Sequence, residues 1–194
     1  WFHGASVGEI LSIVPLIQYY EKNKKINQIL ITSSTLSSSN ILSKYKFKKT
    51  IHQFYPIDYT IFTNKFLNIW KPSIAIFVDS EIWPSMFKNL RKKKIPLILL
   101  NARLTKKTVA RWLKIKSFTK NIFNKITIAF PQNIETNNFL KKIKATKITF
   151  IGNLKFAQHL SEKSDRIENN LKIKIKDKKI WVASSTHYNE EIIC

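Results

Sequence analysis

The chain begins Trp1-Phe2-His3-Gly4-Ala5-Ser6-Val7-Gly8-Glu9, an apolar strand pattern that breaks at glycine and leads into a helical pattern. Two of the three glycines of the whole chain fall in these nine residues. Glycine permits conformations and close approaches that a side chain forbids, so the pair indicates a tight strand-to-helix turn beside a ligand. Open α/β sheets bind their ligands just beyond such strand ends.

Glu9 has two interpretations at this stage. Ser6 can cap the helix that follows, and Glu9 lies three residues on, at the spacing of a capping box. Alternatively, Glu9 is a catalytic carboxylate at the C-terminal end of the first strand, where a parallel sheet places its functional groups. The local residues are compatible with both.

Beyond this stretch, short apolar runs alternate with amphipathic segments, the pattern of βα units around a parallel sheet. The predicted helices cover residues 7–23, 37–45, 106–125 and 133–142, with two more beginning near residues 60 and 84. Pro15 is expected to kink or interrupt the first of them. The predicted strands are residues 1–5, 29–32, 52–55, 74–78, 96–100, 126–130 and 147–151.

These elements predict an α/β, Rossmann-like domain over residues 1–155. Residues 156–178 are polar and charged and are interpreted as a linker and helix. The apolar run at residues 180–183 predicts the first strand of another sheet, so residues 179–194 are interpreted as the start of a second domain.

Composition narrows the classes of protein that the chain can belong to. Hydrophobic residues make up 44% of the chain, which excludes wholesale disorder, and the single cysteine, Cys194, excludes an internal disulfide. No Cys/His spacing typical of zinc is present. The formal net charge of +22 favours an anionic partner or surface, although the abundance of Lys, Asn and Ile throughout also indicates a compositional bias.

Five short motifs, in order along the chain, resemble the Kdo transferases, which move 3-deoxy-D-manno-octulosonic acid (Kdo) from CMP-Kdo onto lipid A in Gram-negative bacteria. The motifs are His3-Gly4-Ala5-Ser6-Val7-Gly8-Glu9, Glu81-Ile82-Trp83-Pro84, Asn101-Ala102-Arg103-Leu104, Gly152-Asn153-Leu154-Lys155-Phe156 and Ala183-Ser184-Ser185-Thr186-His187 with Glu190-Glu191. Some positions depart from the family pattern: Gly4 stands where alanine or serine is commoner, Ala157 where aspartate is common and Asn189 where glycine is frequent. The loop at residues 32–40 is rich in hydroxyls but lacks the usual proline and glycine.

The resemblance implies a GT-B architecture, with an N-terminal acceptor-side domain followed by the beginning of a Rossmann-like donor-binding domain. It further implies that a segment with a membrane anchor in many members precedes Trp1, that most of the donor domain follows Cys194, and that the isolated chain is inactive. The implied partners are a lipid A precursor (lipid IVA), CMP-Kdo and an anionic membrane surface, at the cytoplasmic face of the inner membrane. No cofactor or metal is implied.

The resemblance also assigns roles to individual residues. Glu9 would be the general base, and Glu81 and Lys155 would stabilise the transition state. The further candidate substrate-binding residues are Ser6, Gly8, Arg103 and His187. Several have an alternative: Ser6 as a cap, Arg103 in a structural ion pair, Lys155 as a solvated lysine, Glu81 as a carboxylate favoured by a helix dipole, and His187 at the domain interface instead of the nucleotide.

Two further interpretations stay open. The charge and the 12% aromatic residues also suit a nucleic-acid-binding module, although the lysines are spread along the chain and no specific nucleic-acid partner is expected. The predicted helix at residues 106–125 mixes basic and apolar side chains, which suits either packing on the sheet or contact with anionic lipid.

Overall fold

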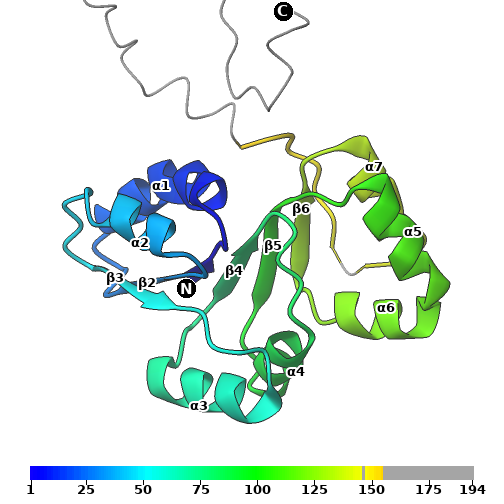
Figure 1. Cartoon of the computed structure of the whole chain (residues 1–194), viewed down its shortest axis with the longest axis horizontal. Helices are drawn as coiled ribbons and strands as arrows, with labels where there is room; N and C mark the ends of the chain where they lie inside the picture. The colour runs from blue at the N-terminus through cyan, green and yellow to red at the C-terminus, as the bar shows by residue number, and fades with distance from the viewer. Residues whose placement is uncertain (146, 155–194) are drawn as a thin grey trace, which may run out of the picture. The chain divides into compact units, whose positions relative to one another are not determined.

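A computed structural model of the chain describes residues 1–145 and 147–154, and these residues form a parallel six-stranded sheet covered by helices (Figure 1). The sheet order is β3-β2-β1-β4-β5-β6. The strands are β1 (Phe2–His3), β2 (Ile29–Ser33), β3 (Thr50–Phe54), β4 (Ala75–Val78), β5 (Leu97–Ala102) and β6 (Ile128–Pro131). The predicted α/β, Rossmann-like class is confirmed.

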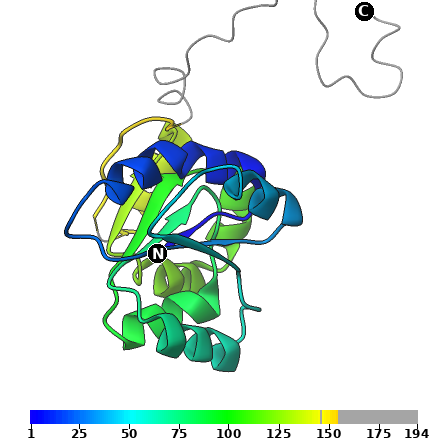
Figure 2. The same ribbon diagram turned by 90° about the vertical axis from the view of Figure 1, so that its left-hand side faces the viewer.

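The helices cover both faces of the sheet, and each face has its own apolar core (Figures 1 and 2). The helices are α1 (Val7–Glu21), α2 (Leu36–Leu42), α3 (Thr60–Trp70), α4 (Pro84–Lys92), α5 (Lys106–Lys114), α6 (Lys116–Phe123) and α7 (Ile134–Lys142). Buried side chains of α1 and α2 pack on one face, and those of α3, α4, α6 and α7 pack on the other. Successive strand residues point to opposite faces, so Phe2 joins the first core and Trp1 the second.

Asp58, in the loop between β3 and α3, caps the neighbouring helix α4. Its carboxylate accepts the backbone N–H of Ser85 at 3.0 Å and that of Met86 at 2.8 Å. The first N–H groups of a helix have no partner within the helix, and the helix dipole favours a negative charge there. The contact fixes the start of α4, and with it the loop that follows β4.

The expected interruption at Pro15 is wrong, because α1 continues through it from Val7–Glu21. A proline inside a helix costs about 3 kcal/mol. The helix buries Ile10, Ile13, Val14 and Ile17 almost completely, and each such side chain contributes about 1.5–3 kcal/mol. Packing on the sheet therefore outweighs the lost backbone bond.

Two other segments differ from the sequence-based expectation. Residues 106–125 form two helices rather than one, because Ile115 leaves helical conformation with φ −116° and ψ 54°. Residues 147–151 contribute only a parallel bridge between Ile148 and Ala129 instead of a seventh strand. Phe150 and Ile151 stay about half exposed, so little apolar burial favours a longer pairing there.

The interpretation of residues 156–178 as a linker and helix, and of residues 179–194 as the start of a second domain, lies outside the described residues. In the part of the chain that is described, no helix combines the length and the apolar character that crossing a bilayer requires.

Candidate active site

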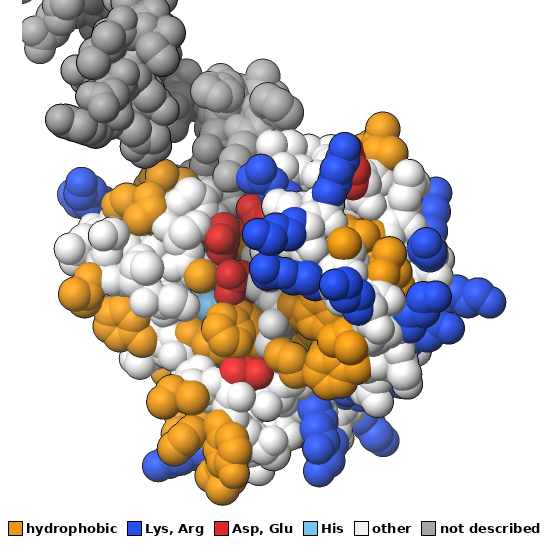
Figure 3. All heavy atoms as spheres, turned by 45° about the vertical axis from the view of Figure 1, so that its right-hand side comes forward, with side chains coloured by type: hydrophobic (Ala, Val, Ile, Leu, Met, Phe, Trp, Pro, Cys, Tyr) orange, Lys and Arg blue, Asp and Glu red, His pale blue; other side chains and the backbone are white. Residues whose placement is uncertain are grey.

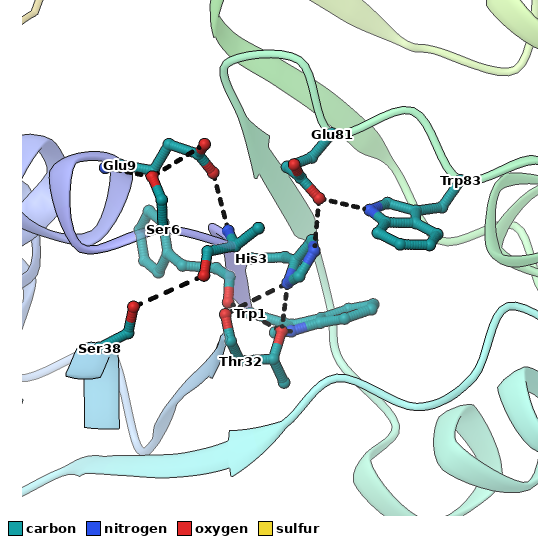
Figure 4. Close-up of polar contacts among 10 residues, drawn as sticks. Trp1, His3, Ser6, Glu9, Thr32, Ser38, Glu81 and Trp83 are labelled. Atoms are coloured by element: carbon teal, nitrogen blue, oxygen red, sulfur yellow. Dashed lines mark hydrogen bonds and ion pairs between the residues drawn. The ribbon is translucent and has the colours of Figure 1, made fainter. Parts of the chain in front are cut away.

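The strand order reverses between β1 and β4, and the space outside the carboxyl ends of these two strands is called the crevice between β1 and β4 below. From β1 the chain moves outward through β2 and β3, whereas β4 starts the opposite half with β5 and β6. Open α/β sheets bind ligands at the carboxyl ends of the strands, where the strand order reverses in this way. Glu9 lies in the first turn of α1, just after β1, and Glu81 lies in the loop just after β4. In Figure 4 the two carboxylates point into the space between these elements.

Glu9 forms the helix cap that its spacing from Ser6 predicts. Its backbone N–H donates to Oγ of Ser6 at 3.4 Å, and its Oε1 accepts the Ser6 hydroxyl at 3.0 Å. Its Oε2 accepts the backbone N–H of Ala5 at 2.7 Å. A carboxylate has about four acceptor positions, so a capped Glu9 can still receive a proton or a further hydrogen bond.

Gly4 allows the turn to lie this close to Glu9. A Cβ at position 4 would lie 3.1 Å from Cβ of Glu9 and 3.4 Å from Cδ1 of Ile10. Among the described glycines, only Gly152 has a positive φ, so Gly4 relieves a tight contact with Glu9 and is not required by an unusual backbone conformation.

Burial raises the pKa of the Glu9 carboxyl above its usual value. The negative charges of Glu81 and Asp79 raise that pKa further. The hydrogen bonds from Ala5 and Ser6 act in the opposite direction, because they stabilise the ionised form, but they do not cancel the shift. Glu9 is therefore a stronger base than an exposed glutamate.

Glu81 is held by two ring N–H groups. Its Oε2 lies 2.7 Å from Nε1 of Trp83 and 3.1 Å from Nε2 of His3, and its side chain is only 14% exposed. His3 is completely buried. The alternative interpretation of Glu81, as a carboxylate favoured by the dipole of the following helix, does not account for these side-chain contacts. The contacts direct Glu81 toward the crevice between β1 and β4 (Figure 4).

Aromatic rings form the wall behind Glu81. The ring of Tyr55 stacks on that of His3, with centroids 4.0 Å apart, and lies 4.8 Å from that of Trp83. Burial raises the pKa of the Tyr55 hydroxyl well above its usual value, and Asp58 and Glu81 raise it further. The Tyr55 hydroxyl oxygen is buried and has no hydrogen-bond partner among the described residues.

Tyr55 and the hydrogen bond of Trp83 to Glu81 were not predicted from the sequence, whereas the sequence-based interpretation of His3 was a packing or hydrogen-bonding residue rather than a ligand, and its ring does both. His3 and Trp83 lie inside the sequence motifs given above, so a role for both residues in the site could have been predicted from the motifs. Tyr55 lies in none of the motifs. Only the fold, which brings the end of β3 over β1, places it beside them.

Three of the predicted substrate-binding residues, Ser6, Gly8 and Arg103, lie at the carboxyl ends of the strands but differ in their contacts. Gly8 is exposed in the first turn of α1, and Ser6 is exposed beside it. Arg103 follows β5 and is exposed; it has no ion pair with another described residue, so the structural ion pair is not seen there. Within the described ranges, no group of three or more His, Cys, Asp or Glu residues could hold a metal ion.

The hydroxyl-bearing residues 32–35, at the end of β2 and just before α2, make contacts within the protein. Thr35 caps α2 by accepting the N–H of Ser38 at 3.2 Å. Thr32 and Ser33 are fully buried, and the Ser33 hydroxyl lies 2.8 Å from Nε2 of His52. Lys155 and His187, the two remaining predicted site residues, lie outside the described residues.

The charges around the crevice have opposite signs on its two sides. Figure 3 shows acidic side chains gathered near the middle of one face, with lysine and arginine side chains directly beside them. Glu9, Asp79 and Glu81 follow β1 and β4, whereas the exposed Arg103, Lys106 and Lys107 follow β5. The arrangement can accept a proton at the carboxylates and bind an anion at the basic side.

We expect the Glu9 carboxyl to titrate above the usual glutamate range, and Glu81→Gln to move its midpoint to lower pH by removing a negative neighbour. Carboxyl-carbon NMR titration measures both. Because the folded pKa of Glu9 is raised, its stabilising contribution is complete at low pH and is lost as the pH rises through that pKa. An unchanged Glu9 midpoint in Glu81→Gln would show that the two carboxylates do not interact.

Sequence comparison gives a family match over most of the chain. Residues 1–158 match the family described as 3-deoxy-D-manno-octulosonic-acid transferase (kdotransferase). The 3-deoxy-D-manno-octulosonic acid transferase of Rickettsia typhi is 37% identical over 194 residues, which cover 98% of this chain and 41% of that protein. The enzyme of the same name from Haemophilus influenzae is 28% identical, over 100% of this chain and 46% of that protein. The chain thus spans less than half the length of these relatives.

Two solved structures share the fold. The Staphylococcus aureus MnaA–UDP co-structure superposes with a TM-score of 0.64 at 15% identity, over 92% of this chain and 50% of that one. The UDP-GlcNAc 2-epimerase of Neisseria meningitidis, bound to UDP-GlcNAc, gives a TM-score of 0.56 at 14% identity, over 91% and 52% of the two chains. At such identities the likeness shows the fold alone, and that fold is GT-B-like.

Proposed function

Because the chain belongs to the 3-deoxy-D-manno-octulosonic-acid (Kdo) transferase family, we propose that it forms the acceptor side of an enzyme that moves Kdo from CMP-Kdo to a lipid A precursor, lipid IVA. The observation that most supports this proposal is the pair of carboxylates, Glu9 and Glu81, that flank the crevice between β1 and β4. The proposal concerns the whole protein, because this chain corresponds to less than half of its relatives.

The proposed reaction is a direct displacement. An acceptor hydroxyl oxygen forms a bond to the anomeric carbon of Kdo while the bond from that carbon to the CMP phosphate oxygen breaks. The phosphate leaves with the electron pair, and the proton of the attacking hydroxyl passes to the Glu9 carboxylate. A positioned general base of this kind contributes a factor of about 10²–10⁴ in rate.

The surroundings of Glu9 suit that role. Its raised pKa favours proton uptake, while the N–H of Ala5 keeps the carboxylate in one orientation. Glu81 is proposed to stabilise positive charge that develops on the sugar ring in the transition state.

The basic candidates are proposed to bind the negative parts of the two substrates. Arg103, exposed after β5, would contact an acceptor phosphate, and Lys155 would offset charge at the departing CMP phosphate or the Kdo carboxylate. Ser6 and Gly8 would contact the acceptor, and His187 the nucleotide. The reaction as proposed needs no cofactor, and CMP-Kdo is the donor substrate.

The surface around the crevice suits an acceptor that sits in an anionic membrane, at the proposed location on the cytoplasmic face of the inner membrane. The basic residues of α5 and α6 are all exposed: Lys106, Lys107, Arg111, Lys114, Lys116 and Lys120. Ile115 and Phe118, between these basic residues, are about half exposed. Further exposed apolar side chains, Ile57 and Ile61, lie near the start of α3 at the same edge of the sheet.

We expect Lys106→Gln/Lys107→Gln to weaken binding to vesicles of anionic phospholipid about 30-fold, because each of the two basic residues near such a surface contributes about 1 kcal/mol. Vesicle co-sedimentation at two salt concentrations measures the change. Arg91→Gln/Lys92→Gln is the matched control, because these exposed residues end α4 at the opposite edge of the sheet. If both variants lost the same affinity for the vesicles, the effect would come from the net charge of the protein and not from the surface formed by α5.

The proposed function is tested by assaying Kdo transfer from CMP-Kdo to lipid IVA with the product of the complete reading frame that encodes this chain. Transfer is expected. A well-folded protein that transfers no Kdo would contradict the proposal. The 194-residue chain alone is expected to be inactive, and transfer by it would overturn that expectation.

A further inference from the structure

The completely buried ring of His3 is in contact at both nitrogens. Nδ1 lies 2.9 Å from Oγ1 and 3.2 Å from the carbonyl oxygen of Thr32, its register partner on β2. Nε2 lies 3.1 Å from Oε2 of Glu81. His3 therefore connects the centre of the sheet to the carboxylate that follows β4.

The partners determine which nitrogen faces Glu81 with a proton. Nε1 of Trp1 donates to Oγ1 of Thr32 at 2.9 Å, so the Thr32 hydroxyl proton can go to Nδ1 of His3 at 2.9 Å, which is nearer than its other acceptor, the carbonyl oxygen of Phe2 at 3.5 Å. If Nδ1 instead donates to the Thr32 carbonyl, Nε2 must also be protonated, since its lone pair would otherwise face an ionised carboxylate. Both arrangements put the proton on Nε2, so His3 donates to Glu81.

The ring itself has little freedom to move. Tyr55 stacks on one side of it, with centroids 4.0 Å apart, and Phe77 contacts it edge-on with centroids 5.0 Å apart. A second donor, Nε1 of Trp83, reaches the same Oε2 of Glu81 at 2.7 Å. Oε2 of Glu81 therefore accepts two hydrogen bonds, and Oε1 accepts none from a described residue. Oε1 is the oxygen that faces the crevice (Figure 4).

We propose that His3 is a positioning residue of the site: the hydrogen-bonded series Trp1–Thr32–His3 fixes Oε2 of Glu81, so that Oε1 is aimed at the reacting sugar. His3 does not touch substrate in this role. It acts through Glu81. The hydrogen bonds do not depend on the proposed function, whereas the expected effect on the rate of transfer rests on it.

The first test is a double-mutant cycle. His3→Phe keeps the stacked ring but removes both nitrogens, and it is expected to lower kcat about 10- to 100-fold with little change in KM, because a displaced functional group costs about that much. His3→Gln, which keeps an N–H donor at a similar distance from the backbone on a more flexible side chain, is expected to recover part of the loss. In a Glu81→Gln background, His3→Phe is expected to change kcat by less than about twofold, because its effect passes through Glu81.

A matched control separates positioning from damage to the strand. Phe2→Leu alters the neighbouring residue of β1, whose side chain packs in the core on the opposite face of the sheet. Its effect on kcat is expected to be the same with and without Glu81→Gln. Additive effects of His3→Phe and Glu81→Gln would overturn the positioning role.

A second readout does not depend on activity. In the 194-residue chain, the carboxyl-carbon NMR signal of Glu81 at neutral pH is expected to change in chemical shift in His3→Phe but not in Phe2→Leu, because only His3→Phe removes one of the two donors that hold Oε2. If the complete protein transferred no Kdo but this signal still changed, the proposed function would fail while the His3–Glu81 contact stood. A Glu81 signal that is the same in His3→Phe as in the parent would overturn the proposal whatever the transfer assay shows.

Discussion

Glu9→Gln is expected to reduce Kdo transfer by the complete protein about 10²- to 10⁴-fold, the contribution of a positioned general base. Glutamine has nearly the size of glutamate and its amide oxygen can still accept the N–H of Ala5 or the Ser6 hydroxyl, so the cap is retained in part. It has no carboxylate to take the proton of the acceptor hydroxyl. The loss should therefore appear in kcat, which initial rates at saturating donor and acceptor measure.

Glu135→Gln is the matched control for this substitution. Glu135 also lies in the first turn of a helix, α7, but it is exposed. It follows β6, the outermost strand of the sheet, and is therefore away from β1 and β4. Its replacement is expected to leave transfer within about twofold of the parent, as for most surface substitutions. If Glu9→Gln were as active as Glu135→Gln, Glu9 would be a helix cap and nothing more.

Phe77→Ala is expected to lower the free energy of unfolding by about 3–5 kcal/mol, the range for a buried aromatic residue cut back to alanine. Phe77 is completely buried on β4 and makes edge contacts with the rings of Trp1, His3 and Phe87, at centroid distances of 5.1, 5.0 and 5.3 Å. The cavity would open beneath the candidate site. Denaturation of the chain in urea, followed by tryptophan fluorescence, measures the loss.

Phe62→Ala provides the comparison for Phe77→Ala, because Phe62 is 50% exposed on α3. It is expected to change the free energy of unfolding by less than about 1 kcal/mol, since little of its contact area is lost and no closed cavity forms. Similar losses for the two substitutions would mean that the core around Phe77 is not packed as described.

Apolar periodicity was sufficient to predict most of the fold. The parallel sheet, its six strands and most helices follow from alternating buried runs and amphipathic segments. Failures occurred where tertiary packing decides. Pro15 is tolerated because the buried face of α1 outweighs a local penalty, and residues 147–151 stay almost unpaired because their side chains find little to cover them.

The candidate site was only partly predictable, for a similar reason. The position of Glu9 and Glu81 after strands, together with the motifs, was enough to bring them to one edge of the sheet. The hydrogen bond from His3 to Glu81 spans 78 residues, and no local pattern reports such a contact. The place of Tyr55 depends on the strand order, which neither periodicity nor composition determines.

The strand order also has a consequence for how the chain folds. β1, β2 and β3 are consecutive in sequence, as are β4, β5 and β6, and within the sheet the two halves are joined by the pairing of β1 with β4. That pairing aligns Phe2 with Ile76, so two residues far apart in the sequence must come together to form a strand pair in which β1 has only two residues. The loss of chain entropy in this step is not offset by local contacts. We expect each half to gain structure early and their docking to limit the rate of refolding. The contact between His3 and Glu81 crosses this joint and would therefore be among the last to form.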